Sequence, residues 1–304
     1  LNGNPGVSYY DATNGDLKFC YRNGEDWIIS VVDTAGDVGR FASLGFDLSG
    51  NPGISYYDAM NGDLKYAGWD GAGWDIKVVD SLGDVGSYCS LEMDCLGKPA
   101  ISYHDATNGD LKYAHWSGPV WEIQVVDSKG WVGLYTSLAF DDLKRPAISY
   151  HDATSGALKY AHWDDKAWVL ENVDSKQVAG HLTSLAFDGC GSPAISYDSP
   201  ITGDLKYAFP SNPSPNQPVN KSPISGSTYV SLTPTLECEA FADPCTDSHR
   251  ASQWVVATEN CEINCSLVFD SGVDRSNLLK ITIPENVLQP NTTYYWCVRH
   301  QDCH

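Results

Sequence analysis

The sequence predicts an all-β protein built from a repeated unit, and three observations support this prediction. A motif of the form ISYxDATNGDLKYAxW recurs along the first two thirds of the chain at a fixed spacing of 47 residues, which is typical of repeat architectures. Each unit contains four short runs rich in Tyr, Ile, Val and Trp, separated by turn residues. No segment has a convincing helical period. The tyrosines that mark the five copies are Tyr9, Tyr56, Tyr103, Tyr150 and Tyr197.

The four runs of a unit predict four antiparallel strands, which we call A, B, C and D in chain order. Four such strands in 40–50 residues are typical of one blade of a β-propeller. Small residues in run A favour the innermost position, and a repeated tryptophan in run D favours the outermost one, where it can cover the space between neighbouring blades. In the third unit the runs are SLEMD (90–94), PAISYHD (99–105), LKYAHW (111–116) and WEIQVVD (121–127).

The Asn-Gly dipeptide between runs B and C predicts a two-residue type I′ hairpin turn. In the third unit such a turn would place His104 opposite Tyr113, and His115 opposite Ser102. The two histidines would then be diagonal neighbours on one face of the sheet, within reach of a shared metal or ligand.

Runs B and C occur five times, but runs A and D occur four times each. We therefore expect a propeller of about five four-stranded blades over residues 1–209, with the first and last blades incomplete. Because open sheet edges invite pairing, either the sequence is a fragment of a longer protein or a neighbouring chain supplies the missing strands. We favour the fragment.

A second domain is predicted after a proline-rich linker. Residues 210–223 contain five prolines, which predicts an extended spacer. Residues 224–304 contain strand-like runs of a β-sandwich, with a tyrosine two residues before an inward Trp296, as at a tyrosine corner. A sandwich of this kind needs about 100 residues, so we expect its last strand to be missing. Six cysteines here are disulfide candidates with open connectivity and favour an oxidising compartment: Cys238, Cys245, Cys261, Cys265, Cys297 and Cys303.

The repeat ISYxDATNGDLKYAxW resembles a unit found in tandem in secreted bacterial β-propeller proteins. The segment from SPISGSTYVSLTPTLECEAF to NTTYYWCVRHQDCH resembles the fibronectin type III-like modules that follow such propellers. The resemblance implies a secreted protein, extracellular or at the cell surface, of a kind that commonly has no established reaction.

The charge balance excludes several function classes. The chain has 39 acidic and 19 basic residues and a formal net charge of -20, which opposes nucleic-acid binding. The sequence contains no run of 18 apolar residues, so it predicts no membrane span. We predict no cofactor. Calcium is the one metal that the loop carboxylates suggest, but DATNGD does not follow the calcium-loop pattern.

Aspartates recur at the strand ends of every unit, and such residues usually hydrogen-bond the backbone of the following turn. A catalytic pair is needed once, so equal repetition favours a structural role and we predict no catalytic residue and no enzyme. The three sets close strands B, D and A: Asp11, Asp58, Asp105 and Asp152; Asp33, Asp80, Asp127 and Asp174; Asp47, Asp94, Asp141 and Asp188.

Positions that break the repeat are the better binding candidates. Trp131 lies in a D-to-A connection where other units have Asp or Val, and an aromatic face near a loop suits a sugar ring or a peptide side chain. Histidines replace other residues at two positions of the third and fourth units, although each could simply substitute for a tyrosine ring. These histidines are His104, His115, His151 and His162.

The predicted function is therefore non-enzymatic binding or surface display, with the propeller faces contacting glycan or protein ligands. One alternative is a structural subunit of an extracellular filament or surface layer, in which copies of the chain complete each other's sheets by strand donation. A second alternative is a carbohydrate-active enzyme with its site at the propeller axis.

Overall fold

The computed structural model describes residues 4–176, 178–188, 191–210, 216–242, 249–258 and 267–301. The chain divides into two compact units, Leu1–Pro210 and Ser211–His304, which are described separately. Every regular element in the described ranges is a β-strand, so the all-β prediction is confirmed there. The described part of the chain contains no helix able to cross a membrane.

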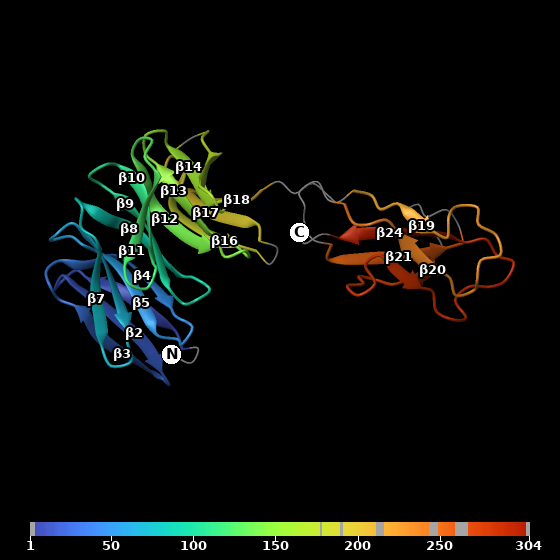
Figure 1. Cartoon of the computed structure of the whole chain (residues 1–304), viewed down its shortest axis with the longest axis horizontal. Coiled ribbons are helices and arrows are strands. Elements are labelled where there is room, and N and C mark those ends of the chain that lie inside the picture. The colour runs from blue at the N-terminus through green and yellow to red at the C-terminus, as the bar shows by residue number, and fades with distance from the viewer. Residues whose placement is uncertain are drawn as a thin grey trace. The chain divides into compact units, whose positions relative to one another are not determined.

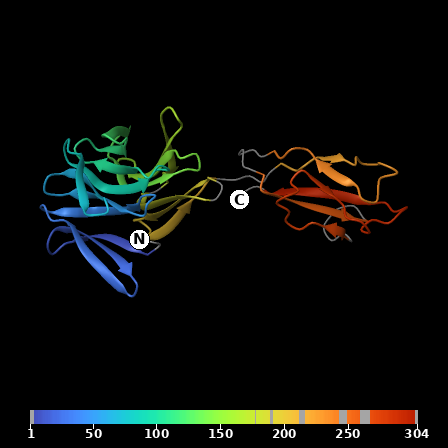
Figure 2. The ribbon, with the colours of Figure 1, turned by 60° about the horizontal axis from the view of Figure 1, so that its bottom comes forward.

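The first unit consists of five antiparallel sheets that follow one another in chain order, from blue to yellow in Figures 1 and 2. Three have four strands and two have three, which is consistent with a β-propeller-like repeat fold. The sheets are β1 (Gly6–Asp11), β2 (Asp16–Asn23) and β3 (Asp26–Asp33); β4 (Val38–Phe46), β5 (Pro52–Asp58), β6 (Asp63–Trp69) and β7 (Trp74–Asp80); β8 (Val85–Met93), β9 (Pro99–Asp105), β10 (Asp110–Trp116) and β11 (Trp121–Asp127); β12 (Val132–Phe140), β13 (Pro146–Asp152), β14 (Ala157–Trp163) and β15 (Trp168–Asp174); and β16 (His181–Phe187), β17 (Pro193–Ser199) and β18 (Asp204–Ala208).

The strands within each sheet are those predicted. Strands A, B, C and D pair in sequence order. In the part of the chain that the structure describes, the first sheet consists of strands B, C and D and the last of strands A, B and C. The A strands β4, β8 and β12 are longer than predicted, because each starts several residues before the SLxF run. Successive A strands β4, β8, β12 and β16 lie side by side.

The prediction of a two-residue turn between strands B and C is wrong. Asp105 pairs with Asp110, which leaves a four-residue loop in which Gly109 alone has positive φ, at 77°. The Gly109 N–H donates to the Asp105 carbonyl oxygen at 2.8 Å. His104 therefore lies opposite Leu111, and His115 lies opposite Ala100, four residues further along β9. At about 3.3 Å per residue, the two histidines are too far apart to share a ligand.

Neighbouring sheets pack through one recurring apolar contact. A leucine and an aromatic residue of strand C, such as Leu64 and Tyr66, meet an isoleucine and a tyrosine of strand B in the next sheet, here Ile101 and Tyr103. The outer-strand tryptophan of the next sheet covers this contact, as predicted: its ring meets the strand-C ring edge to face. The three pairs are Phe19–Trp74 at 5.5 Å, Tyr66–Trp121 at 5.6 Å and Tyr113–Trp168 at 5.3 Å between centroids.

The described residues of the second unit form two three-stranded sheets. Their apolar contact includes the fully buried Trp254, on which Trp296 stacks with 6.1 Å between ring centroids. The hydroxyl of Tyr294 accepts a hydrogen bond from the Gln289 N–H at 2.8 Å, the contact that defines a tyrosine corner. The sheets are β19 (Asn220–Ser222), β20 (Thr235–Cys238) and β23 (Lys280–Thr282), and β22 (Leu267–Asp270), β21 (Ala251–Ala257) and β24 (Tyr295–Gln301).

The predicted disulfides are not supported where the structure describes them. Cys238 and Cys297 are free thiols, and the Cys238 sulfur lies 3.3 Å from Nε2 of His300. The other four candidates lie outside the described residues: Cys245, Cys261, Cys265 and Cys303.

Candidate ligand-binding site

A row of aromatic rings crosses the A strands of the first unit. Phe41 of β4 contacts Tyr88 of β8 with 4.6 Å between ring centroids, and Tyr88 contacts Tyr135 of β12 at 4.7 Å. Tyr135 continues the row to His181 of β16 at 4.9 Å. We call these four side chains the aromatic ladder. Phe41 is exposed, and the other three rings are partly exposed.

The backbone under the ladder adopts a conformation that bulky residues rarely adopt. Phe41, Tyr88 and Tyr135 have φ values of 55°, 55° and 53°, in the left-handed region, and Leu182 repeats this at 48°. A large non-glycine residue there is uncommon, and such strain persists where the surrounding structure enforces it. Strand pairing is interrupted at the same positions, so β4, β8 and β12 are each bulged beneath their ladder ring. In β16 the strained residue is Leu182, next to the ladder residue His181.

The next sheet holds each bulge in place through the carbonyl group of the strained residue. Thr136 Oγ1 donates to the Tyr88 carbonyl at 2.8 Å, and Thr183 Oγ1 donates to the Tyr135 carbonyl at 2.8 Å. The Cys89 thiol lies 3.1 Å from the Phe41 carbonyl oxygen in the equivalent place. These contacts satisfy acceptors that the bulges remove from the strand pairing, and they fix the direction of the rings.

A second line of side chains borders the ladder at one position of strand B. It includes Tyr57, whose ring centroid lies 6.2 Å from that of Phe41, and His104, which lies 6.4 Å from Tyr88. His151 lies 6.4 Å from Tyr135 and 4.5 Å from His181. The border rings therefore pack beside the ladder; Tyr57 is partly exposed, whereas His104 and His151 are buried beneath it.

The border changes character between the second and third sheets, and two positions change together. In the second sheet the Tyr57 hydroxyl donates to Asp84 at 2.7 Å, and Tyr10 and Asp37 make the same contact in the first. In the third sheet Trp131 replaces this aspartate, and a histidine replaces the tyrosine. A hydroxyl there would lose its carboxylate acceptor, whereas an imidazole can use the backbone instead.

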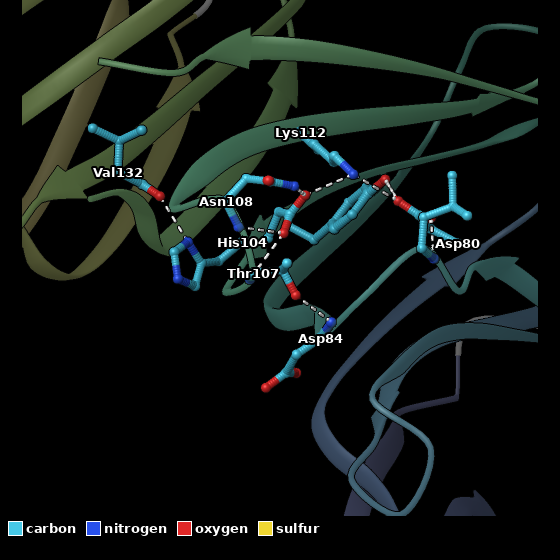
Figure 3. A network of polar contacts seen from close by, with 10 residues as sticks. Asp80, Asp84, His104, Thr107, Asn108, Lys112 and Val132 are labelled. Atoms are coloured by element: carbon cyan, nitrogen blue, oxygen red, sulfur yellow. Dashed lines mark hydrogen bonds and ion pairs between the residues drawn. The ribbon is translucent and has the colours of Figure 1, made fainter. Parts of the chain in front are cut away.

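The histidines of the border are held in one orientation by backbone carbonyls. Nδ1 of His104 donates to the Val132 carbonyl at 2.7 Å (Figure 3), and Nδ1 of His151 donates to the Ala179 carbonyl at 2.6 Å. Burial lowers the pKa of both imidazoles, so both are neutral at pH 7. With the proton on Nδ1, Nε2 presents a lone pair. Nε2 of His104 is buried and has no hydrogen-bond partner among the described residues.

The structure brings three of the predicted site residues to the ladder and its border. Trp131 is 45% exposed, and its ring centroid lies 5.2 Å from that of His104. His151 lies at the other end, beside Tyr135 and His181.

The other two predicted histidines lie elsewhere. Nε2 of His115 lies 3.0 Å from a carboxylate oxygen of Asp94, and the imidazole stacks on Tyr113. The ring of His162 stacks on Tyr160 with 5.5 Å between centroids. Both histidines thus make local contacts away from the ladder.

The repeated aspartates are structural, as predicted, and Figure 3 shows one junction between two sheets. Asp105 accepts the backbone N–H groups of Thr107 and Asn108, both at 3.0 Å, and Lys112 reaches its other oxygen at 2.8 Å. Lys112 also lies 3.2 Å from Asp80 of the preceding sheet, which accepts the Tyr103 hydroxyl at 2.8 Å. The junction therefore ties two sheets together.

The charges of this junction are stabilised by their contacts. Burial alone would raise the pKa of Asp105, but the hydrogen bonds from Lys112 and Asn108 outweigh it and hold the pKa below its usual value. Burial also raises the pKa of Tyr103, and the neighbouring Asp80 raises it further. The lowered pKa keeps Asp105 ionised beside Lys112 at neutral pH, which suits a structural ion pair.

The described residues contain no group of three or more His, Cys, Asp or Glu side chains placed to hold a metal ion. The weak calcium hypothesis and the expectation of no cofactor both stay predictions.

Comparisons with known proteins assign no family. No protein-family model matches the sequence, and no curated protein matches it significantly. Among solved structures, SapL1 lectin in complex with α-methyl fucoside is similar at 14% identity and a TM-score of 0.47, over 93% of this chain and 94% of that chain. An Aleuria aurantia lectin mutant in complex with Fucα1-6GlcNAc has 14% identity and a TM-score of 0.44, over 81% of each chain.

An exo-β-1,3-galactanase from Phanerochaete chrysosporium has 10% identity and a TM-score of 0.43, over 98% of this chain and 90% of that chain. Similarity at this level, to lectins and to an enzyme alike, assigns neither a family nor a ligand.

Proposed function

We propose that the chain is a non-enzymatic binding protein and that its aromatic ladder contacts a glycan. The observation that supports this is the row of rings formed by the exposed Phe41 and the partly exposed Tyr88 and Tyr135, each on a strained backbone that the next sheet holds in place. Backbone strain is found at ligand-binding sites, and here it accompanies large rings that solvent can reach. Flat apolar faces bordered by polar groups suit the C–H faces and hydroxyls of a sugar.

The charge of the chain favours a neutral glycan over an acidic one. The net charge is -20, and two carboxylates, Asp37 and Asp84, stand at the border of the ladder. Carboxylate oxygens accept hydrogen bonds from sugar hydroxyls but repel sulfated or carboxylated sugars. At the other end Trp131, which is 45% exposed, adds an aromatic face beside His104.

We also propose that the first unit is a five-bladed β-propeller with incomplete first and last blades, and that the second unit is a fibronectin type III-like sandwich. The whole chain would belong to a secreted or cell-surface protein. The proposal rests on the strand order of the five sheets, on the Tyr294–Gln289 contact in the second unit, and on the sequence resemblance.

A glycan panel tests the proposed function. The whole chain is screened against immobilised neutral and acidic glycans, and hits are measured by isothermal titration calorimetry. We expect binding to neutral glycans, a loss of at least tenfold in affinity in Tyr88→Ala and Tyr135→Ala, and no change in Tyr229→Ala, an exposed tyrosine of the second unit. Equal binding by the ladder variants and the wild type would refute the assignment of the site. Turnover of a bound glycan would favour the enzyme alternative.

A further inference from the structure

The contact between neighbouring sheets is made four times and always uses the same positions. The strand-C leucine of one sheet is fully buried, with 0% exposure, against the strand-B isoleucine and tyrosine of the next. The four leucines are Leu17, Leu64, Leu111 and Leu158. Their partners are Ile54 and Tyr56, Ile101 and Tyr103, Ile148 and Tyr150, and Ile195 and Tyr197.

Each half of this contact, the strand-C half and the strand-B half, occurs a fifth time in the chain. In that fifth copy the side chains are exposed instead of buried. Leu205 of β18 stands where the four buried leucines stand, yet it is 82% exposed, and Tyr207 beside it is 63% exposed. Val7 of β1 stands where the buried isoleucines stand and is 46% exposed. Tyr9 follows it in the tyrosine position and is partly exposed. The first and fifth sheets thus expose the two complementary halves of one interface.

We propose that the fifth sheet of one molecule docks on the first sheet of a second copy of this chain, so that Leu205 and Tyr207 pack on Val7 and Tyr9 of the neighbour. The occupant follows from the interface that is already present. Each buried strand-C leucine is covered by a strand-B Ile–x–Tyr face, and among the described residues β1 exposes the similar Val7–x–Tyr9 face. Because the two halves differ, the association is head to tail and leaves a free half at each end.

The new contact lacks two parts of the internal one. Inside the chain, Tyr103 and Lys112 also bind Asp80 from strand D of the preceding sheet, and Gly86 of strand A packs against Leu64. Among the described residues, the fifth sheet consists of strands A, B and C, and the first consists of strands B, C and D. We therefore expect a weak association that depends on protein concentration. It goes beyond glycan binding and does not depend on it.

Sedimentation velocity of the whole chain over a concentration series tests the proposal. We expect the wild type to shift to larger species as concentration rises. Leu205→Asp and Val7→Asp should each stay monomeric, and Leu82→Asp, at a leucine with 79% exposure outside both faces, should behave as wild type. Circular dichroism and thermal unfolding establish that each variant is folded.

A mixture of the two variants gives the sharpest result. Leu205→Asp keeps an intact first-sheet face and Val7→Asp keeps an intact fifth-sheet face, so an equimolar mixture should form dimers but no larger species. A wild type that stays monomeric at all concentrations, or a mixture that stays monomeric while the wild type associates, overturns the proposal. A monomeric wild type that Leu205→Asp destabilises but Leu82→Asp does not would indicate closure within one chain instead.

Discussion

Replacing Lys112 with methionine tests the account of the sheet junctions, because this lysine neutralises two buried carboxylates in neighbouring sheets. Its ammonium group lies 2.8 Å from Asp105 and 3.2 Å from Asp80, and the side chains of the two aspartates are 0% and 2% exposed. Methionine preserves the length and apolar stem but leaves both carboxylates without a counter-ion. Removing one partner of a buried ion pair costs about 3–5 kcal/mol.

For a unit of this size, each 1 kcal/mol lowers the midpoint of thermal unfolding by about 2–4 °C, so Lys112→Met should lower it by about 6–20 °C. Differential scanning calorimetry measures the shift. Lys18→Met is the matched control, because Lys18 pairs with Asp11 of its own sheet and is more exposed. Adding Asp80→Asn to Lys112→Met should recover part of the loss. A loss in Lys112→Met no larger than that in Lys18→Met would refute the reasoning.

Three further predictions concern the close approach of Gly86 to Leu64, the ion pair of Asp105 and the hydrogen bond from Thr136 to Tyr88. Gly86→Ala should unfold at a lower temperature than Gly71→Ala. Both glycines have φ near 100°, but a Cβ at Gly86 would lie 2.7 Å from the Leu64 Cα, whereas one at Gly71 meets nothing within 4 Å. Equal losses of stability in the two variants would contradict the close approach of Gly86 to Leu64. The pKa of Asp105 is lowered in the folded state, so its contribution to stability is present above the unfolded pKa of about 4 and disappears as pH falls through the folded value. Calorimetry between pH 7 and pH 2 should show this loss, and it should be smaller in Lys112→Met. Thr136→Val leaves the carbonyl of a ladder tyrosine without its donor and should cost about 1–3 kcal/mol in chemical denaturation and weaken glycan binding; unchanged binding would mean that this bond does not position the ladder.

The strands of the first unit could be predicted from the sequence because the repeat supplies five versions of one pattern. Residues such as Ile101 and Tyr103 alternate with polar or small neighbours, and their 47-residue recurrence fixes which runs belong to the same sheet. The recurring aspartates could also be assigned correctly, since a residue such as Asp105 accepts backbone N–H groups in every loop of its kind.

The hairpin register could not be predicted from the Asn-Gly dipeptide. The side chain of Asp105 binds the N–H groups of Thr107 and Asn108, which stabilises a four-residue loop in place of the two-residue turn. The different register places His115 far from His104, so the predicted histidine pair does not form.

The aromatic ladder was missed because its cause lies in the backbone and in the neighbouring sheet. The predicted strand A was limited to the SLxF run, which contains small residues and excludes the ladder positions before it. A positive φ at Tyr88 could not be predicted either, because aromatic residues rarely adopt this conformation. The contact that fixes it, from Thr136, joins residues 48 positions apart. A signal was present nonetheless: aromatic residues recur at 41, 88 and 135, each followed by a small residue.

The most direct test of the central claim is saturation-transfer difference NMR with a neutral oligosaccharide, on the wild type and on Phe41→Ala. Saturation of the protein's aromatic protons should pass to the ring protons of the sugar in the wild type, because the ladder rings are exposed or partly exposed. The transfer should fall several-fold in Phe41→Ala, an exposed ring at the end of the ladder. Equal transfer in both proteins, or none from any neutral glycan to the wild type, would contradict the account.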